Sequence, residues 1–410
     1  MKSNDEVAIF TVCNIAYLHK ALVLADSLYA NSGYTINIFL FDKKQELNLV
    51  DEHCIIHWIE DLNVPNFLHL AFRYDIIEFS TSLKPFITLF LLNDHSKVIF
   101  FDPDICIYSP IDVILKDLNS NSILLTPHYT TPQSDDISES DTGMMRFGSF
   151  NLGFFGIKKS DQSIDFLNWW SRRCIDLCYM ESHFGLSTDQ KWVSIAPCFY
   201  EDIKVSFNKG YNVAPWNSFE RKISLSPDGL ILVNSQFQLV FFHFSNYDFS
   251  DPGYINARSL YEKGVIREDI QRLGEEYSLA LKLKLSKYVS HSTVLYAYNY
   301  MSNGYYISPM LRHAYSSVYS SLKHIDDPFD SDSLVGKFAK RNYLISKKIA
   351  PLGYMKNNLN KNEGYALEIK IMNFLLKCLL MVIGPNKFHV FTRGLVYFSS
   401  PRLNKGLWKI

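Results

Sequence analysis

The chain of 410 residues is too long for one ordinary hydrophobic core, which favours two domains. Apolar residues make up 47% of it and charged residues 20%, a composition that excludes an intrinsically disordered chain. The net charge of −1 divides unevenly, because residues 333–410 hold fourteen Lys or Arg and two acids, or +12, which leaves −13 for residues 1–332. This split indicates two functional parts.

The cysteines and the N-terminus both predict a cytoplasmic protein. The seven cysteines are odd in number and most lie within apolar runs. The N-terminal MKSNDEVAIF lacks the basic segment and long apolar core of a signal peptide. Cys174 and Cys178 stand four residues apart on a predicted helix, but two further ligands at zinc-site spacing do not accompany them.

The first 130 residues alternate short apolar runs with helical patterns, which predicts βαβ units, a mainly parallel sheet and an α/β fold. The apolar runs are VAIFTVC (7–13), INIFLFD (36–42), KVIFFD (97–102) and SILLTP (122–127), and YLHKALVLADSLYA (17–30) is a helical pattern. Such sheets bind ligands beyond the carboxyl ends of their strands. Asp42, Asp102 and Asp104 fall at these ends.

The middle of the chain continues with a polar loop and then more apolar elements. Residues 129–149 are acidic without apolar periodicity, which predicts a disordered loop or a functional lid. FNLGFFGI (150–157), a long helix through residues 163–180, STDQKWVSIAP (187–197) and LILVNSQFQLVFFHFSNYD (230–248) follow. From about residue 260 the pattern becomes helical and stays basic, so we expect domains at 1–260 and 261–410.

An apolar strand runs into Asp102-Pro103-Asp104, within VIFFDPDICIYSP. Side chains two positions apart on a strand point to the same side, so the two carboxylates can share a cation. Mg²⁺ and Mn²⁺ prefer oxygen ligands and commonly bridge carboxylates to a diphosphate. An Asp turn with its backbone set by Pro103 is the structural alternative. Haloacid dehalogenase-type phosphatases also carry an Asp nucleophile after a strand with a second Asp following it. Their motif usually lies near the N-terminus and has Thr or Val at the position of Cys106, so this class is disfavoured.

Four motifs occur in the order FFDPDICIYSP, FNLGFFGI, STDQKWV and FFHFSN, and together they resemble the GT-A glycosyltransferases. The likeness covers roughly residues 7–250. It is closest to bacterial polysaccharide glycosyltransferases and more distant to the retaining family that includes glycogenin and lipooligosaccharide galactosyltransferases. It implies a Rossmann-like GT-A catalytic domain that binds a nucleotide sugar over 1–260. A mostly helical, basic region for acceptor or membrane association would follow over 261–410.

The resemblance implies a metal site and a reacting face. Asp102 and Asp104 resemble the metal-binding carboxylates, and His243 resembles the histidine that completes the metal shell. A core histidine is the alternative for His243. Asp189 and Gln190 resemble the catalytic pair at the reactive face of the donor sugar, a role compatible with a helix N-cap at Asp189. The chain departs from distant members at HFSNYDFSDPG, which lacks a lysine that follows this histidine in them.

The resemblance also implies residues around the donor. Lys84 resembles a basic residue that pairs with the carboxylates or phosphates, with an exposed helix lysine as the alternative. Asn151 and Gly153 resemble the segment bordering the donor sugar, with a strand bulge as the alternative. The nucleoside edge is assigned to Thr11, Asn14 and Asp42.

GYNVAPWN (210–217) resembles a segment on the acceptor side. Tyr211 and Trp216 could stack on sugar faces there, with Asn217 beside them. Core packing is an equal alternative for each ring.

The expected function is metal-dependent transfer of a sugar from a nucleotide sugar, by resemblance a UDP-sugar. The acceptor is a glycan or lipid-linked glycan in bacterial surface polysaccharide synthesis, the cofactor is Mn²⁺ or Mg²⁺, and no nucleic acid partner is expected. The resemblance favours retention at the anomeric carbon, and Asp141 is the alternative base for an inverting enzyme. A non-catalytic saccharide-binding scaffold subunit and a nucleotidyltransferase remain open. The latter would show a Gly-rich, basic segment where this chain has VCNIAYLH.

The C-terminal region predicts contact with an anionic membrane surface. IMNFLLKCLLMVI (371–383) contains only thirteen residues and carries Lys377, whereas a spanning helix needs about 20 apolar residues. Residues 369–410 contain seven Lys or Arg and no acid. We therefore expect peripheral association with the cytoplasmic face of the cell membrane without crossing, and a core helix is the alternative.

Overall fold

The computed structural model describes residues 6–47, 51–132, 140–245, 247, 267–288, 295–345 and 366–410. Its contacts divide the chain into two compact units. The first comprises Met1–Phe67 with Ile76–Ala297, and the second Leu68–Asp75 with Tyr298–Ile410. The domain boundary predicted at 260 lies outside the described residues and stays a prediction.

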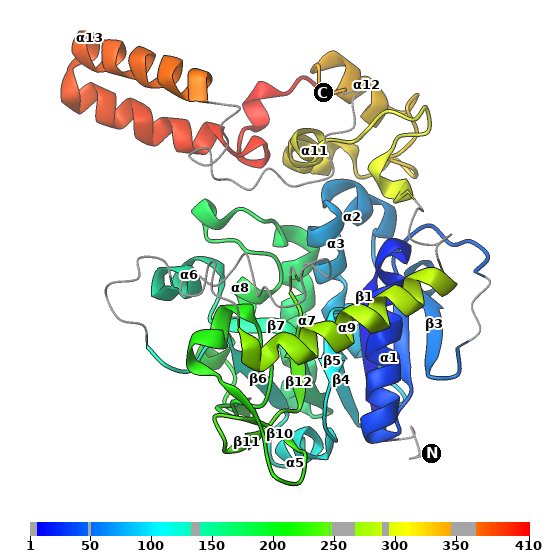
Figure 1. The fold of residues 1–410 in the computed structure, drawn as a ribbon. Helices are drawn as coiled ribbons and strands as arrows, with labels where there is room; N and C mark the ends of the chain where they lie inside the picture. The colour runs from blue at the N-terminus through cyan, green and yellow to red at the C-terminus, as the bar shows by residue number, and fades with distance from the viewer. Residues whose placement is uncertain are drawn as a thin grey trace. The chain divides into compact units, whose positions relative to one another are not determined.

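The first unit contains a seven-stranded sheet in the order β3-β2-β1-β4-β7-β6-β8 (Figure 1). The strands are β1 (Val7–Cys13), β2 (Ile36–Leu40), β3 (Cys54–Trp58), β4 (Lys97–Phe101), β6 (Ile123–Pro127), β7 (Phe150–Lys158) and β8 (Ile203–Val205). β7 is antiparallel to its neighbours β4 and β6, and the other neighbouring pairs are parallel. The predicted α/β fold with a mainly parallel sheet is confirmed. The half-buried edge strand β3 was not predicted.

Helices cover both faces of this sheet. α1 (Leu18–Ser32) packs on one face and α7 (Asp161–Leu177) on the other. The other helices described over residues 67–287 are α2 (Phe67–Arg73), α3 (Ile76–Ser82), α4 (Lys84–Leu91), α5 (Asp112–Ser120), α6 (Ser140–Phe147), α8 (Gln190–Val193) and α9 (Glu268–Lys287). Short 3₁₀ turns lie at Ile15–Tyr17, Ile59–Leu62, Ser182–Phe184, Ala196–Cys198 and Pro215–Glu220. α2 begins in the first unit and continues into the second. α6 replaces part of the loop predicted over 129–149, of which residues 133–139 lie outside the described chain.

The buried strands have cores on both faces, which explains why every residue of β1 is buried. Ile9 packs with α1 residues such as Leu22 in one apolar cluster. Phe10, which alternation sends to the other face, lies 4.9 Å from the ring of Phe100. Phe155 continues that aromatic layer at 5.2 Å from Phe100. The continuous apolar runs in the sequence are therefore strands of a sheet buried on both sides.

Two small sheets complete the first unit. β5 (Ile105–Ile107) pairs antiparallel with β12 (Phe241–His243). β9 (Ile223–Leu225), β10 (Ile231–Val233) and β11 (Phe237–Gln238) form a three-stranded antiparallel sheet. The β5–β12 pair is the one that matters for function, because it sets His243 opposite Ile105, next to the Asp102-Pro103-Asp104 turn.

The second unit is helical, as predicted for the C-terminal region. It contains α11 (Pro309–Leu322), α12 (Leu334–Arg341), α13 (Ala366–Phe398) and 3₁₀ turns at Pro401–Leu403 and Lys405–Leu407, and the turn Ala297–Asn299 crosses into it. Arg312 on α11 is buried and donates hydrogen bonds of 2.7 Å to the carbonyl oxygens of Ala71 and Tyr74. These bonds attach residues 68–75 to the C-terminal helices and offset the cost of burying the guanidinium charge.

Candidate metal and donor site

Asp102, Asp104 and His243 lie together at the carboxyl end of β4. One ligand atom from each lies within 4.8 Å of the other two. His243 Nε2 is 3.1 Å from Asp104 Oδ1 and 3.8 Å from Asp102 Oδ2. Burial acts to raise the pKa of Asp104, but the charge and hydrogen bond of the His243 ring, together with Lys20 and a backbone hydrogen bond, outweigh it, so the pKa is lowered. The structure therefore brings together the three residues that the sequence assigns to the metal.

The donor set fits a hard divalent cation. Two carboxylates and one imidazole supply oxygen and nitrogen ligands, which Mn²⁺ and Mg²⁺ accept. Two carboxylates this close would repel one another without a positive partner. The site is thus suited to a cation, and Asp102, Asp104 and His243 are the residues that would hold it.

Gly153 on β7 provides the space in which these side chains meet. A Cβ atom at this position would lie 2.4 Å from His243 Cε1 and 2.8 Å from Asp102 Oδ2. The Gly153 carbonyl also accepts a hydrogen bond of 2.7 Å from the Asp102 backbone N–H. Asn151 Oδ1 accepts one of 3.1 Å from the Gly153 N–H. Asn151 and Gly153 therefore border the metal cluster, and glycine is required for close approach.

Asn212 is a functional candidate that the sequence reading missed. Its side chain is fully buried, and its Oδ1 lies 3.2 Å from His243 Nδ1. Its Nδ2 donates to Asn151 Oδ1 at 3.0 Å and to Thr126 Oγ1 at 3.1 Å. The backbone of Asn212 is left-handed, with φ of 52°. Asparagine tolerates this conformation, which is the local signal that could have singled it out within GYNVAPWN.

Lys84 and Asp189 form a buried ion pair beside the metal cluster. Lys84 Nζ lies 3.3 Å from Asp189 Oδ2 and 3.5 Å from Asp102 Oδ1, and it donates to the Leu152 carbonyl at 2.8 Å. Burial acts to lower the pKa of Lys84, but Asp102 and Asp189 outweigh it and the pKa is raised. Burial raises the pKa of Asp189 although Lys84 acts against it. The ammonium thus bridges the metal cluster and the predicted catalytic carboxylate.

Gln190 follows Asp189 at the start of α8 and is half-buried. Its Nε2 donates a hydrogen bond of 3.0 Å to the Phe147 carbonyl at the end of α6. Lys191 donates from its Nζ to the Met145 carbonyl on the same helix. Asp189 precedes α8 but makes no side-chain cap bond to it. The predicted pair therefore separates in the structure, with Asp189 buried beside Lys84 and Gln190 tied to α6.

Thr11, Asn14 and Asp42, assigned to the nucleoside edge, lie near the ends of β1 and β2 and are buried. Asp42 Oδ2 accepts a hydrogen bond of 2.6 Å from the Ile15 N–H, and burial raises the pKa of Asp42 to about 6. Asn14 caps the following turn by accepting from the Tyr17 N–H at 3.2 Å. Thr11 Oγ1 is buried without a hydrogen-bond partner in the described part of the chain. Their binding role stays a prediction.

The acceptor-side residues divide between the core and the site. Tyr211 is 1% exposed, stacks on Phe241 at 6.0 Å and donates its hydroxyl to Asp117 at 3.1 Å. This placement is the core alternative that the sequence left open for that ring. Trp216 packs edge-on against the His243 ring at 5.1 Å. Asn217 is fully buried and donates to the Asn212 carbonyl at 3.0 Å.

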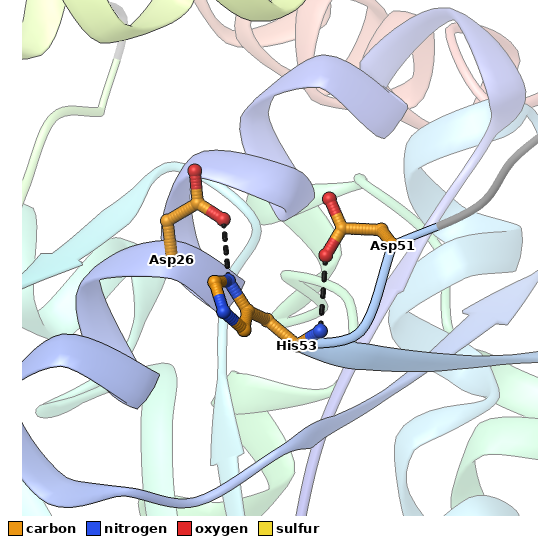
Figure 2. Close-up of side chains that lie close together, drawn as sticks. All are labelled: Asp26, Asp51 and His53. Carbon is orange, nitrogen blue, oxygen red and sulfur yellow. Dashed lines mark hydrogen bonds and ion pairs between the residues drawn. The ribbon is translucent and has the colours of Figure 1, made fainter.

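A second group of possible metal ligands, Asp26, Asp51 and His53, lies elsewhere in the first unit (Figure 2). His53 Nδ1 is 2.9 Å from Asp26 Oδ1. Lys284 Nζ from α9 lies 2.8 Å from Asp26 and 3.1 Å from Asp51. Through these ion pairs the cluster links α9 to α1 and to the start of β3.

Comparison with known proteins gives distant relatives. No protein-family model matches the chain. The uncharacterized protein YfnF of Bacillus subtilis (strain 168) is 26% identical over 208 residues, 50% of this chain and 66% of the relative. The uncharacterized protein YfnD of the same organism is 24% identical over 246 residues, 58% of this chain and 76% of the relative. The matched part of the chain thus spans just under two thirds of the first of these relatives.

Solved glycosyltransferase structures also resemble the chain, at low overall similarity. The galactosyltransferase LgtC with donor and acceptor sugar analogues is 15% identical, and the match covers 67% of this chain and 95% of the LgtC chain with a TM-score of 0.40. The glycosyltransferase GlyE of Streptococcus pneumoniae TIGR4 is 17% identical, and the match covers 70% of this chain and 64% of the GlyE chain with a TM-score of 0.40. The bifunctional glycosyltransferase WbbM is 12% identical, and the match covers 70% of this chain and 52% of the WbbM chain with a TM-score of 0.39. These three solved structures are glycosyltransferases.

Proposed function

We propose that the protein is a metal-dependent glycosyltransferase that moves a sugar from a nucleotide sugar to a glycan or lipid-linked glycan acceptor. The observation that carries this proposal is the Asp102, Asp104 and His243 cluster beside the buried Lys84–Asp189 pair. The cluster lies at the carboxyl end of a sheet strand, where α/β folds bind ligands. Three of the four motifs that resemble GT-A enzymes supply Asp102, Asp104, Asp189 and His243, and Lys84 precedes them in the chain.

The chain's own residues would divide the work. Asp102, Asp104 and His243 would hold Mn²⁺ or Mg²⁺ against the diphosphate of the donor. The bound cation would offset negative charge on the departing nucleoside diphosphate. Lys84 holds Asp189 at 3.3 Å and Asp102 at 3.5 Å, so it fixes the position of both carboxylates. The burial of this region would exclude water from the reacting sugar.

The finer assignments extend the same proposal. The donor would be a UDP-sugar, with Thr11, Asn14 and Asp42 along its nucleoside. Trp216 and Asn217 would lie toward the acceptor, and the transfer would retain the anomeric configuration. The reaction would serve surface polysaccharide synthesis at the cytoplasmic face of the cell membrane, where a lipid-linked acceptor is reached.

The test combines metal dependence with matched variants. The full chain is incubated with Mn²⁺ or Mg²⁺ and a panel of nucleotide sugars, and the nucleotide released is measured with and without chelator. Asp102→Asn and Asp104→Asn should abolish release while the thermal unfolding midpoint stays close to wild type. Asp94→Asn, at an exposed position, is the control and should keep full activity.

Other results would favour the alternatives. Turnover that survives chelation, or near-wild-type turnover in either site variant, would refute the metal role. Saccharide binding without donor hydrolysis for every donor would indicate a scaffold subunit. Release of pyrophosphate when nucleoside triphosphates and sugar phosphates are supplied would indicate a nucleotidyltransferase.

A further inference from the structure

α13 is a helical hairpin. Its backbone leaves the helical region at Gly384, where φ is 75° and ψ is 166°, and Pro385 follows. Glycine adopts this positive φ without strain, and proline prevents the helix from continuing through the turn. Figure 1 shows the ribbon reversing direction there, so that a first arm over 366–383 is followed by a returning arm over 385–398.

The hairpin exposes large apolar side chains along its length. None of the side chains described between residues 367 and 399 is buried. Met381 is 78% exposed, Val382 82% and Val390 71%. Further exposed apolar residues are Leu367, Ile371, Met372, Phe374, Leu375, Phe391, Leu395, Val396, Tyr397 and Phe398. A contiguous apolar surface of this kind marks a binding surface, because exposing it to water is unfavourable.

Each arm carries one polar stripe. In the first arm Lys370, Asn373 and Lys377 follow the spacing i, i+3, i+7, which places them on one side of a helix. In the second arm Asn386, His389 and Arg393 repeat the same spacing. All six side chains are exposed.

The sides away from the polar stripes are mainly apolar in both arms, and the exposed Lys387 next to the turn is the exception in the second arm. They carry Met372, Leu375, Leu379 and Val382 in the first arm and Phe391, Leu395 and Phe398 in the second. This pattern is typical of helices that lie in a membrane interface.

Charge and length identify the surface that would cover the hairpin. The hairpin and the residues after it (366–410) contain seven Lys or Arg and one acid, Glu368, and this excess of positive charge complements an anionic lipid surface. The stretch Lys370–Phe398 is long and apolar enough to cross a membrane if it were straight. The reversal at Gly384 leaves a second arm of 14 residues and a first arm of 18 that carries Lys370 and Lys377, so neither supplies the ~20 apolar residues that a span needs.

We propose that the α13 hairpin is a monotopic membrane element that lies within one leaflet of an anionic bilayer. The polar stripes face the headgroups, and the apolar sides contact the upper acyl chains. Lys370, Lys377 and Arg393 pair with lipid phosphates. Membrane attachment by the hairpin does not depend on the proposed transfer reaction, so an experiment can refute one proposal without refuting the other.

The test is flotation of the full chain with vesicles of phosphatidylcholine alone or with about 30% of the anionic lipid phosphatidylglycerol, which gives the vesicle the negative surface that basic segments bind. The protein should float with the anionic vesicles and at least tenfold less with the neutral ones. The double variant Val382→Asp, Phe391→Asp should lose flotation at least tenfold. Leu279→Asp with Leu283→Asp is the matched control, because both leucines are 61% exposed on α9, and it should float as the wild type does.

A depth measurement distinguishes insertion from surface adsorption. The tryptophan of Phe391→Trp should show a blue-shifted fluorescence emission on anionic vesicles. Lipids brominated near the headgroup end of the acyl chain should quench this emission most. Absence of flotation, or equal loss in the α9 control, would overturn the proposal. Strongest quenching by bromines at the chain ends would overturn the one-leaflet placement. A concentration-dependent dimer that the hairpin variant abolishes, without flotation, would show that a second copy covers the hairpin.

Discussion

Asn212 Oδ1 lies 3.2 Å from His243 Nδ1, on the opposite side of the imidazole from Asp104, which is 3.1 Å from Nε2. An acceptor at Nδ1 favours the tautomer with its proton there and leaves Nε2 as a lone pair for a metal. Asn212 is itself fixed by its bonds to Asn151 and Thr126. Asn212 is therefore a positioning residue for the metal ligand.

Asn212→Gly should weaken Mn²⁺ binding by about 10- to 100-fold, as loss of a partner behind a metal-binding histidine does. Glycine accepts the left-handed backbone at this position, so the change isolates the side chain. The measurement is Mn²⁺ affinity by titration calorimetry. Asn234→Gly, at another left-handed asparagine that is exposed, should leave the affinity unchanged. Equal loss in both variants would show a general effect of destabilisation.

Gly153→Ala should remove metal binding although it adds only a methyl group. The new Cβ would lie 2.4 Å from His243 Cε1, so the imidazole must move away from the carboxylates. Overpacking of this kind costs about 1–3 kcal/mol of stability. Gly156→Ala on the same strand is the control, since its Cβ would meet the movable Leu118 Cδ1 at 2.9 Å. Metal affinity and urea unfolding are measured for both, and unchanged affinity in Gly153→Ala contradicts the close packing.

Lys84→Met should destabilise the fold by about 3–5 kcal/mol, because it leaves the buried Asp189 carboxylate without its ion-pair partner. The double variant Lys84→Met, Asp189→Asn should recover much of that loss. Lys97→Met is the control, because its partner Glu6 is exposed and the pair contributes little. Urea unfolding is measured for wild type, both single variants Lys84→Met and Asp189→Asn, the double variant and the control, and additive losses in the double variant would show that the two charges are not coupled.

The sequence predicted those parts of the site that are formed by residues close together in the chain. The Asp102-Pro103-Asp104 turn follows an apolar strand, and two-residue spacing suffices to bring its carboxylates together. His243 lies 139 positions after Asp104, and it reaches the turn only through the pairing of β12 with β5. The resemblance supplied that link, since strand pairing between distant segments is not visible in one sequence.

Other parts of the site depend on packing that the sequence leaves open. Tyr211 and Trp216 belong to one eight-residue segment, yet one stacks in the core and the other contacts His243. Lys84 could have been an exposed helix lysine, but its helix presents it to Asp102 and Asp189. Whether such a side chain lies in the core or at the site depends on which face of its helix, strand or turn packs against the sheet.

The stability of the protein should fall between about pH 4 and pH 6 through Asp42. Burial raises the pKa of Asp42 to about 6, whereas the pKa of an aspartate in the unfolded chain is near 3.8. The folded state thus binds the extra proton in this range, and stability is lost as the pH rises. The shift of about 2 units corresponds to about 3 kcal/mol. Asp42→Asn keeps an acceptor for the Ile15 N–H, and it should gain stability over wild type as the pH rises from 4 to 7.

The check on Asp42 is urea unfolding of wild type and variant at pH 4 and pH 7. Asp61→Asn, at a side chain that is 54% exposed, reports the effect of removing a carboxylate from the surface. A stability difference between Asp42→Asn and wild type that does not change between the two pH values would show that this carboxyl is not destabilised by burial.

The proposed reaction should proceed with retention at the anomeric carbon. Inversion needs a carboxylate base beside the acceptor. Asp189 is a poor candidate, because it is 2% exposed and held by Lys84 at 3.3 Å. In the proposed reaction its charge would stabilise positive charge on the reacting sugar. An α-linked donor should therefore give an α-linked product, read from the anomeric proton coupling in NMR, and Asp189→Asn should lower kcat more than it changes KM. A β-linked product would instead assign the base to Asp141, whose Oδ1 accepts from the Tyr129 hydroxyl at 3.0 Å, and Asp141→Asn would then abolish turnover.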